Sequence, residues 1–265
     1  MNDVSIAGAL AAAREAAAAA GEIIRHYWQR GVAVELKSDD TPVTIADREA
    51  ELAIRRTLGQ ALPQVAIHGE EFGLDRERGE WLWLVDPLDG TKSFVRRSPF
   101  FSTQIALMRG KELVLGVSSA PVYGETMWAW QGGGAWLDGR QVGIADTVDL
   151  GQASISTGNI RSLTGDTRWD ALGGLIRDSN RIRGYGDFCH YHLLARGALD
   201  LVIESDVNIL DIAALAVIVR EAGGVFTDLQ GKPLTPDTRS VLAGTPAIHA
   251  HALDRLCTTA HARIR

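Results

Sequence analysis

Cysteine is scarce in this sequence. Its 265 residues include only two, Cys189 and Cys257, which stand far apart and belong to no CxxC pair. That spacing excludes a disulfide framework and a cysteine-ligated zinc site. Two unclustered cysteines suit a reducing compartment, so we expect a cytoplasmic protein.

Long apolar runs are also missing. The longest, residues 212–219, has eight residues, whereas a membrane span needs roughly 18. The alanine-rich segment of residues 9–20 is broken by Arg14 and Glu15 and lacks the basic start and cleavage pattern of a signal peptide. We expect an ordinary helix there, because alanine is the best helix former, and no membrane partner.

A basic stripe is absent as well. Lys and Arg number 27 against 33 Asp and Glu, which gives a net charge of −6 and no cationic run. This balance excludes the usual nucleic-acid binder and indicates a soluble surface. The glycines at 132–134 lack the GxGxxG spacing of a dinucleotide site and fit a hairpin loop. An acidic protein that binds a phosphate needs local positive charge, which metal ions provide.

Hydrophobic periodicity predicts a mixed α+β fold with alternating layers of helices and sheets. We expect an N-terminal α+β subdomain over residues 1–145, carrying most metal ligands, and a C-terminal α/β subdomain over 146–265 that completes the site. The expected helices are 4–30, 47–58, 167–177, 186–197, 211–222 and the tail from 248. The expected strands are 32–36, 65–68, 81–85, 103–108, 113–119, 125–130, 153–156, 199–203 and 241–243, with loops at 37–44 and 132–139.

The strongest local feature follows the apolar run of residues 81–85. Asp86 stands at its end, and Asp89, Gly90 and Thr91 come next. Two carboxylates this close repel each other unless a cation lies between them, and hard oxygen ligands suit Mg²⁺. Gly90 lets backbone approach a ligand, and a helix starting here would offer N–H groups to a phosphate. Taken alone, the motif fits an Asp-Pro turn in which Asp89 caps a helix about as well as it fits a metal site.

Three further carboxylates are weak signals when each is taken alone. Glu70 in Gly69-Glu-Glu71 fits a solvated pair, and Asp47 fits the start of a helix. Asp211 fits a helix N-cap, a position where Asp is favoured.

Taken together, these pieces resemble the inositol monophosphatase superfamily of metal-dependent, lithium-sensitive phosphatases. The matching pieces run along nearly the whole chain in the family's order: Lys37 with Asp40-Thr-Pro-Val-Thr-Ile-Ala-Asp47, Gly69-Glu-Glu71, Asp86-Pro-Leu-Asp-Gly-Thr91, Asp211-Ile-Ala-Ala and Glu221-Ala-Gly-Gly224. One departure is Leu210, where many family members carry Trp; it changes the packing beside Asp211 and leaves the ligand in place.

The resemblance implies a role for each matching residue. Two Mg²⁺ ions are implied, with Lys37 near the phosphate or a third, weaker metal site. The first metal would be held by Glu70, Asp86 and the Leu88 carbonyl, and the second by Asp86, Asp89 and Asp211. Asp47 and Thr91 would position and deprotonate the attacking water, and the Gly90 and Thr91 N–H groups would bind phosphate. Water would then attack phosphorus in line, without a covalent phosphoenzyme.

Residues near 187 and 117 favour one branch of that family. Histidinol-phosphate phosphatases are similar at two segments, Gly186-Asp-Phe-Cys189 and Val117-Ser-Ser-Ala-Pro121. Inositol enzymes tend to show Gly-Ser-Ala-Ala at the position of residues 186–189. The substrate, a small phosphate monoester, would then be L-histidinol phosphate, in histidine biosynthesis. The alternatives are a phosphatase for inositol 1-phosphate, another sugar phosphate or a nucleotide, and a non-catalytic relative. The intact ligand set argues against the last. The family also implies a homodimer.

Histidinol phosphate carries an ammonium group and an imidazole, which a pocket would meet with carboxylates away from the metals. Asp187 and Glu204 are the candidates, because the resemblance implies that the organic part of the substrate lies near their segments. Asp187 fits a helix N-cap nearly as well, and Glu204 fits an exposed strand end. His190 and His192 are expected to be ordinary surface or core histidines.

Overall fold

Two compact units make up the chain. The computed structural model describes residues 4–36, 42–165 and 167–262. Unit 1 comprises Met1–Gln141 with Leu210–Ile218, and unit 2 comprises Val142–Ile209 with Val219–Arg265. The division expected from the sequence, at 145/146, assigns residue 211 to the C-terminal part. In the structure the segment Leu210–Ile218 instead packs with the N-terminal unit.

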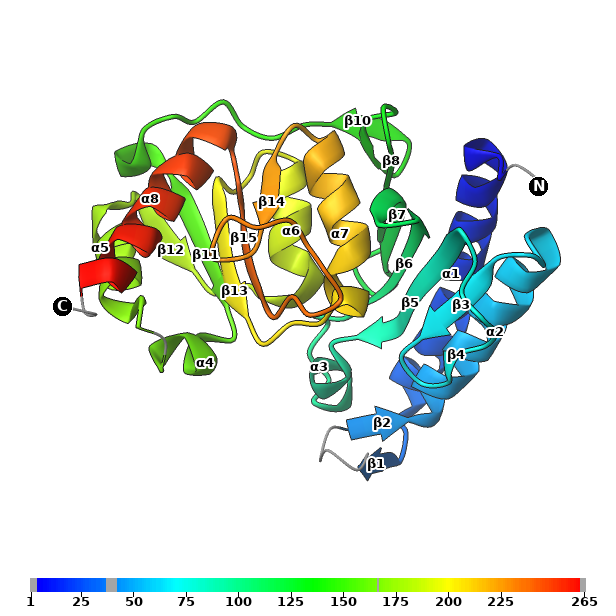
Figure 1. Cartoon of the computed structure of the whole chain (residues 1–265). Helices are drawn as coiled ribbons and strands as arrows, with labels where there is room; N and C mark the ends of the chain where they lie inside the picture. The colour runs from blue at the N-terminus through cyan, green and yellow to red at the C-terminus, as the bar shows by residue number, and fades with distance from the viewer. Residues whose placement is uncertain (1–3, 37–41, 166, 263–265) are drawn as a thin grey trace. The chain divides into compact units, whose positions relative to one another are not determined.

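Helix α1 (Ile6–Arg30) forms where the alanine-rich segment predicts it (Figure 1). Ser5 begins the helix by accepting a hydrogen bond from the Gly8 N–H, and Gly31 follows its end at φ 79°. Its buried alanines recur at helical spacing, at positions 9, 13, 16 and 20. These small side chains let the helix lie close to the rest of unit 1.

An eight-stranded sheet forms the centre of unit 1, in the order β10-β9-β8-β7-β6-β5-β3-β4. Its strands are β3 (Ala66–Gly69), β4 (Gly73–Leu74), β5 (Trp81–Asp89), β6 (Ser102–Arg109), β7 (Glu112–Ala120), β8 (Glu125–Trp130), β9 (Ala135–Leu137) and β10 (Arg140–Val142). Strand β3 pairs with β5 in parallel, whereas β5, β6, β7, β8 and β9 form an antiparallel series. The remaining elements before β3 are β1 (Val34–Leu36), β2 (Pro42–Thr44) and α2 (Ile45–Ala61).

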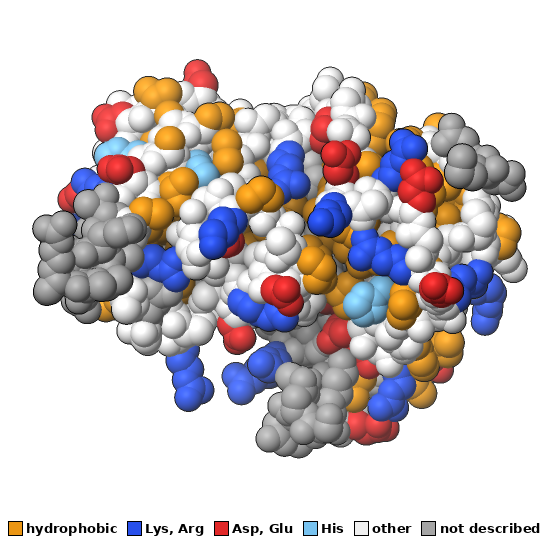
Figure 2. Space-filling view, in the orientation of Figure 1, with side chains coloured by type: hydrophobic (Ala, Val, Ile, Leu, Met, Phe, Trp, Pro, Cys, Tyr) orange, Lys and Arg blue, Asp and Glu red, His pale blue; other side chains and the backbone are white. Residues whose placement is uncertain are grey.

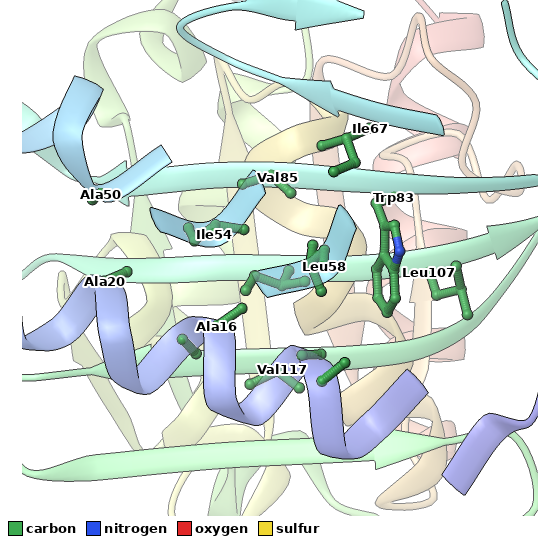
Figure 3. Close-up of a cluster of buried hydrophobic side chains, with 14 of the residues drawn as sticks. Ala16, Ala20, Ala50, Ile54, Leu58, Ile67, Trp83, Val85, Leu107 and Val117 are labelled. Atoms are coloured by element: carbon green, nitrogen blue, oxygen red, sulfur yellow. The ribbon is translucent and has the colours of Figure 1, made fainter. Parts of the chain in front are cut away.

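One face of this sheet packs against α1 and α2. Alternate residues along the strands, including Trp83, Val85 and Leu107, are fully buried in the same cluster as alanines of α1 and Ile54 of α2. Figure 3 shows these side chains between the strands and the two helices. Both helices therefore lie with their apolar stripes against this face of the sheet.

Helix α7 (Ile209–Glu221) packs against the same sheet at Gly116 of β7. A Cβ on Gly116 would lie 2.4 Å from the carbonyl oxygen of Ala214, so only glycine permits this approach. Because Gly116 and Val117 are neighbours on one strand, they point to opposite faces, and α7 covers the face that α1 and α2 leave. This contact explains why Leu210–Ile218 belongs to unit 1.

Unit 2 is built on a five-stranded sheet in the order β12-β11-β13-β15-β14. Strand β11 pairs in parallel with β12 and β13, and β15 pairs antiparallel with β13 and β14. The strands are β11 (Ser154–Gly158), β12 (Arg181–Arg183), β13 (Leu201–Ser205), β14 (Val225–Thr227) and β15 (Ser240–Gly244). The helices are η1 (Leu150–Gln152), α4 (Ile160–Thr164), α5 (Trp169–Asp178), α6 (Asp187–Ala195) and α8 (Pro246–Ala262).

Apolar side chains of α5 and α8 pack with the sheet of unit 2 in one cluster. Leu172 and Leu175 come from α5, and Ile248 and Ala252 from α8. Helix α6 packs through Tyr191, whose ring stacks on Phe226 of β14 at 5.5 Å between centroids. Helices and sheets thus alternate in layers within each unit, which confirms the mixed α+β fold class.

Several short elements escape prediction from the sequence. The segment expected as a loop over 37–44 ends in β2, and the expected hairpin loop over 132–139 contains β9. Strands β10, β12 and β14 are also unpredicted, and each has three residues. Three residues are too few to show an alternating pattern, so their pairing with a neighbouring strand decides their conformation.

Charged side chains of both signs are interspersed on the face shown in Figure 2. Among the helices of the described residues, none is long and apolar enough to cross a membrane.

Candidate metal centre

The end of β5 brings Asp86 and Asp89 to one face of the sheet. Residues three apart on a regular strand point to opposite faces. Here Asp86 pairs with Gln104 and Asp89 with Ser102, so β5 carries one residue more than β6 over this stretch. This β-bulge places Asp89 on the same face of the sheet as Asp86, because their partners Gln104 and Ser102 are two apart on β6 and point to the same face. Both carboxylates therefore lie on the α7 face.

Helix α7 supplies the third carboxylate. The carboxylate oxygens of Asp86, Asp89 and Asp211 lie within 4.8 Å of one another. The helix begins at Ile209, so Asp211 stands inside its first turn rather than at the N-cap. The explanation of Asp211 as a simple cap therefore does not hold.

Glu70 completes the cluster from the segment after β3. Its backbone N–H donates to the carbonyl of Val85, 3.1 Å away, which fixes it beside the end of β5. Its carboxyl group is close enough to that of Asp86 to raise the pKa of Asp86. Glu70 therefore lies beside Asp86, and the expectation that the two share a metal stays a prediction.

The electrostatics of Asp86 show what this cluster needs. Asp86 is only 2% exposed. Its pKa is raised well above the usual value, first by burial and then by the charges of Glu70, Asp89 and Asp211. Three carboxyl groups within 4.8 Å of one another, with Glu70 beside Asp86, are stable together only if they share protons or hold a cation. A donor set made entirely of carboxylate oxygens fits a hard divalent cation such as Mg²⁺.

Asp47 and Thr91 form a hydrogen-bonded pair in unit 1. The Thr91 hydroxyl lies 2.9 Å from Asp47 Oδ1 and 3.0 Å from the carbonyl oxygen of Leu88. Asp47 Oδ2 accepts from the N–H and the hydroxyl of Thr44, which begins α2. Burial raises the pKa of Asp47, and hydrogen bonds from Thr44 and Thr91 oppose that rise. The sequence predicts a helix that starts at Asp47, two residues later than α2 starts in the structure. The side chain of Asp47 also reaches Thr91, which a simple helix start does not explain.

Gly90 stands at the turn between β5 and α3 (Thr91–Val95) with φ 87°. A Cβ there would lie 2.6 Å from the Phe100 carbonyl oxygen, so both space and conformation require glycine. Leu88 is fully buried and its N–H donates to Asp86 Oδ1 over 3.0 Å. The proposed contacts of the Leu88 carbonyl with metal, and of the Gly90 and Thr91 N–H groups with phosphate, remain predictions. Lys37 lies outside the described residues.

The two carboxylates predicted to recognise the substrate belong to unit 2 and differ in their surroundings. Asp187 is the first residue of α6, half-buried, with φ 47°, and Gly186 occupies the N-cap. Glu204 is only 4% exposed, so it is not an exposed strand end. Its Oε2 accepts from the Tyr191 hydroxyl at 2.6 Å and lies 3.1 Å from His190 Nε2. His190 and His192 are both buried.

Glu51 has a place near the cluster that the sequence did not reveal. It lies on α2 one turn after Asp47 and is fully buried. The signal was available in principle, since a carboxylate four residues after Asp47 falls on the same helix face. In the hydrophobic pattern, however, Glu51 only interrupts the apolar stripe of α2. The groups that hydrogen-bond it are distant in sequence.

Comparison with known proteins gives consistent matches. The sequence model of the inositol monophosphatase family matches residues 7–265. A histidinol-phosphatase of Streptomyces coelicolor is 36% identical and covers 97% of each chain. A histidinol-phosphatase of Mycobacterium tuberculosis is 38% identical, with 84% of this chain and 87% of that protein aligned. A solved inositol monophosphatase of Thermotoga maritima has a TM-score of 0.83 at 30% identity, covering 93% of this chain and 96% of that one.

Proposed function

The chain belongs to the inositol monophosphatase family and is a phosphatase of small phosphate monoesters, and we propose that it hydrolyses L-histidinol phosphate to L-histidinol and phosphate with Mg²⁺. The observation that supports metal-dependent chemistry is the gathering of Asp86, Asp89 and Asp211 within 4.8 Å. The similarity to two histidinol-phosphatases over most of the chain supports the substrate and a role in histidine biosynthesis.

Each residue of the centre has a proposed role. Glu70, Asp86 and the Leu88 carbonyl would hold one Mg²⁺, and Asp86, Asp89 and Asp211 a second. When bound, the cations supply positive charge that stabilises the transition state and makes a water molecule more acidic.

Thr91 and Asp47 would handle the proton of the attacking water. The water would donate to Thr91 Oγ1, and the hydroxyl proton would pass to Asp47 Oδ1, 2.9 Å away. Burial makes Asp47 a stronger base than an exposed aspartate, because it disfavours the charged form. The products are the free alcohol and inorganic phosphate.

Recognition of the organic part of the substrate would fall to Asp187 and Glu204. L-Histidinol phosphate is cationic at its amine, and a carboxylate binds that group by a charge-assisted hydrogen bond. Asp187 is the stronger candidate, since it is half-buried whereas Glu204 is only 4% exposed. Lys37, Gly90 and Thr91 would bind the phosphate.

A second candidate substrate is myo-inositol 1-phosphate, favoured by the structural similarity to the inositol monophosphatase of Thermotoga maritima. Phosphate release from both esters, measured side by side with Mg²⁺ and with EDTA, separates the two. We expect EDTA-sensitive hydrolysis with a strong preference for L-histidinol phosphate. Preference for the inositol ester would overturn the substrate assignment and the roles of Asp187 and Glu204. If the protein hydrolyses no ester, its assignment as an enzyme is wrong.

From the family alone we also propose a cytoplasmic homodimer. Light scattering of the purified protein measures its mass in solution, and a monomeric mass would contradict the assembly.

A further inference from the structure

Helix α2 carries a second buried carboxylate, Glu51, one turn after Asp47. Its side chain has no exposed surface. Glu51 Oε2 accepts from the N–H of Glu71 over 2.7 Å, and Oε1 lies 3.3 Å from the N–H of Phe72. A buried carboxylate is stable only when its oxygens are paired in this way, so Glu51 and this segment hold each other in place.

The segment held by Glu51 is the one that carries Glu70. Residues 71 and 72 follow Glu70 directly, between β3 and β4, and these elements lie beside α2 in Figure 1. On its other side, the Glu70 N–H is tied to the Val85 carbonyl, one residue before Asp86. Glu70 is therefore fixed between two anchors, one on β5 and one on α2.

Two neighbours are fitted to Glu51. A Cβ on Gly69 would lie 2.0 Å from Glu51 Oε1, so the carboxylate occupies space that only glycine leaves open. Arg55, one turn further along α2, donates from Nε to Glu51 Oε1 over 2.7 Å. Its Nη2 donates to the Gly73 carbonyl over 2.5 Å, so the arginine joins the carboxylate to the far end of the same turn.

We propose that Glu51 is a positioning residue for the metal centre: it does not touch the metal, and it holds the backbone after Gly69 so that the Glu70 carboxylate faces Asp86. This inference rests on the proposed role of Glu70 as a metal ligand. Groups that orient metal ligands contribute to metal affinity, and their loss typically weakens binding by about 10- to 100-fold.

The test compares Glu51→Gln with wild type and with Glu49→Gln, an exposed residue of the same helix. Glutamine has nearly the same shape, but its amide cannot accept two backbone N–H groups and an arginine together. Mn²⁺ is the probe, since it takes the same oxygen ligands as Mg²⁺ and its free form is counted by electron paramagnetic resonance. We expect Mn²⁺ to bind Glu51→Gln about tenfold more weakly and Glu49→Gln as it binds wild type.

Kinetics give a second readout. In Glu51→Gln we expect the Mg²⁺ concentration for half-maximal phosphate release to rise by the same factor, with the rate at saturating Mg²⁺ nearly unchanged. A purely structural role would lower thermal stability and leave Mn²⁺ affinity at the wild-type value, and that result would overturn the inference. If Glu51→Gln does not fold, Arg55→Gln keeps both backbone hydrogen bonds of Glu51. We expect it to weaken Mn²⁺ binding to a smaller extent, and unchanged affinity there would also overturn the inference.

The Mn²⁺ titration needs no substrate, so it separates this inference from the proposed activity. If Glu51→Gln binds Mn²⁺ more weakly but wild type hydrolyses no ester, the positioning role is supported and the proposed activity is wrong. Normal Mn²⁺ binding by Glu51→Gln, in a preparation whose wild type is an active phosphatase, would do the reverse.

Discussion

The Thr91 hydroxyl lies 2.9 Å from Asp47 Oδ1, although the two residues are 44 positions apart in sequence. The other oxygen of Asp47 is held by Thr44, through its N–H at 2.8 Å and its hydroxyl at 2.6 Å. Asp47 is thus fixed by the residue that begins its own helix and directed at Thr91. This arrangement suits a base that accepts a proton through a hydroxyl.

Replacing Asp47 with asparagine tests that role. The amide keeps the size of the side chain but cannot accept a proton, so we expect the rate of phosphate release to fall about 10²- to 10⁴-fold. Mn²⁺ affinity should stay near wild type, because Asp47 is not a proposed ligand. Thr91→Ser should keep most of the activity, since serine retains the hydroxyl. A Thr91→Ser variant as slow as Thr91→Val would contradict the relay.

Asp86→Asn should make the metal-free protein more stable. The pKa of Asp86 is raised in the folded state, by burial and then by its acidic neighbours. Folding is therefore favoured while Asp86 is protonated, and stability is lost as pH rises from its unfolded pKa, about 4, through the higher folded value. At neutral pH in EDTA we expect the variant to gain on the order of 1 kcal/mol in unfolding free energy.

Urea unfolding in EDTA and in Mg²⁺ measures both effects of Asp86→Asn. Asparagine Oδ1 can still accept from the Leu88 N–H, so the local turn should persist. Mg²⁺ should stabilise wild type and leave the variant nearly unaffected. A variant that is less stable than wild type in EDTA at neutral pH would contradict the repulsion argument.

Gly116→Ala should displace helix α7. The new Cβ would lie 2.4 Å from the Ala214 carbonyl oxygen, so the helix must shift. We expect a loss of about 1–3 kcal/mol in stability together with weaker Mn²⁺ binding, because α7 carries Asp211. Gly59→Ala is the matched control, since a Cβ on that glycine of α2 meets nothing within 4 Å. Wild-type metal affinity in Gly116→Ala would show that Asp211 does not depend on this approach.

Asp187→Asn should discriminate between cationic and neutral substrates. Asp187 has φ 47°, a conformation that asparagine also tolerates, so the substitution should leave α6 in place. Loss of a charge-assisted hydrogen bond should raise KM for L-histidinol phosphate about 10-fold or more, with little change for myo-inositol 1-phosphate. Equal losses on both esters would remove Asp187 from substrate recognition.

Much of the candidate metal centre could be predicted from the sequence, because its carboxylates stand near the ends of recognisable elements. The apolar run before Asp86 correctly indicates a strand, although the strand expected over 81–85 continues as β5 to Asp89. What could not be predicted is the side on which Asp89 lies, since an extra residue in a strand leaves no mark in the hydrophobic pattern. The unit to which Asp211 belongs was hidden in the same way, because it depends on contact with Gly116.

Other features follow only from tertiary contacts. Glu204 looks like the exposed end of a strand in sequence, yet it is buried beside Tyr191 and His190 of α6. Glu51 resembles an ordinary charged residue of an amphipathic helix until the backbone of residues 71 and 72 is seen to meet it. In both cases a polar side chain is stable inside because partners far along the chain pair with it, and such partners carry no local signal.

The bulge at the end of β5 has a consequence for how this protein tolerates change. Residues 87 and 88 set the spacing between the two aspartates, and Pro87 meets β6 through its carbonyl, which accepts from the Thr103 hydroxyl over 2.8 Å. If residues 86–89 paired one to one with β6, without the extra residue of the bulge, Asp89 would turn towards the apolar side of the sheet, where α1 and α2 pack, even though every aspartate would still be present. Keeping the bulge is therefore as much a requirement of the centre as keeping the aspartates themselves.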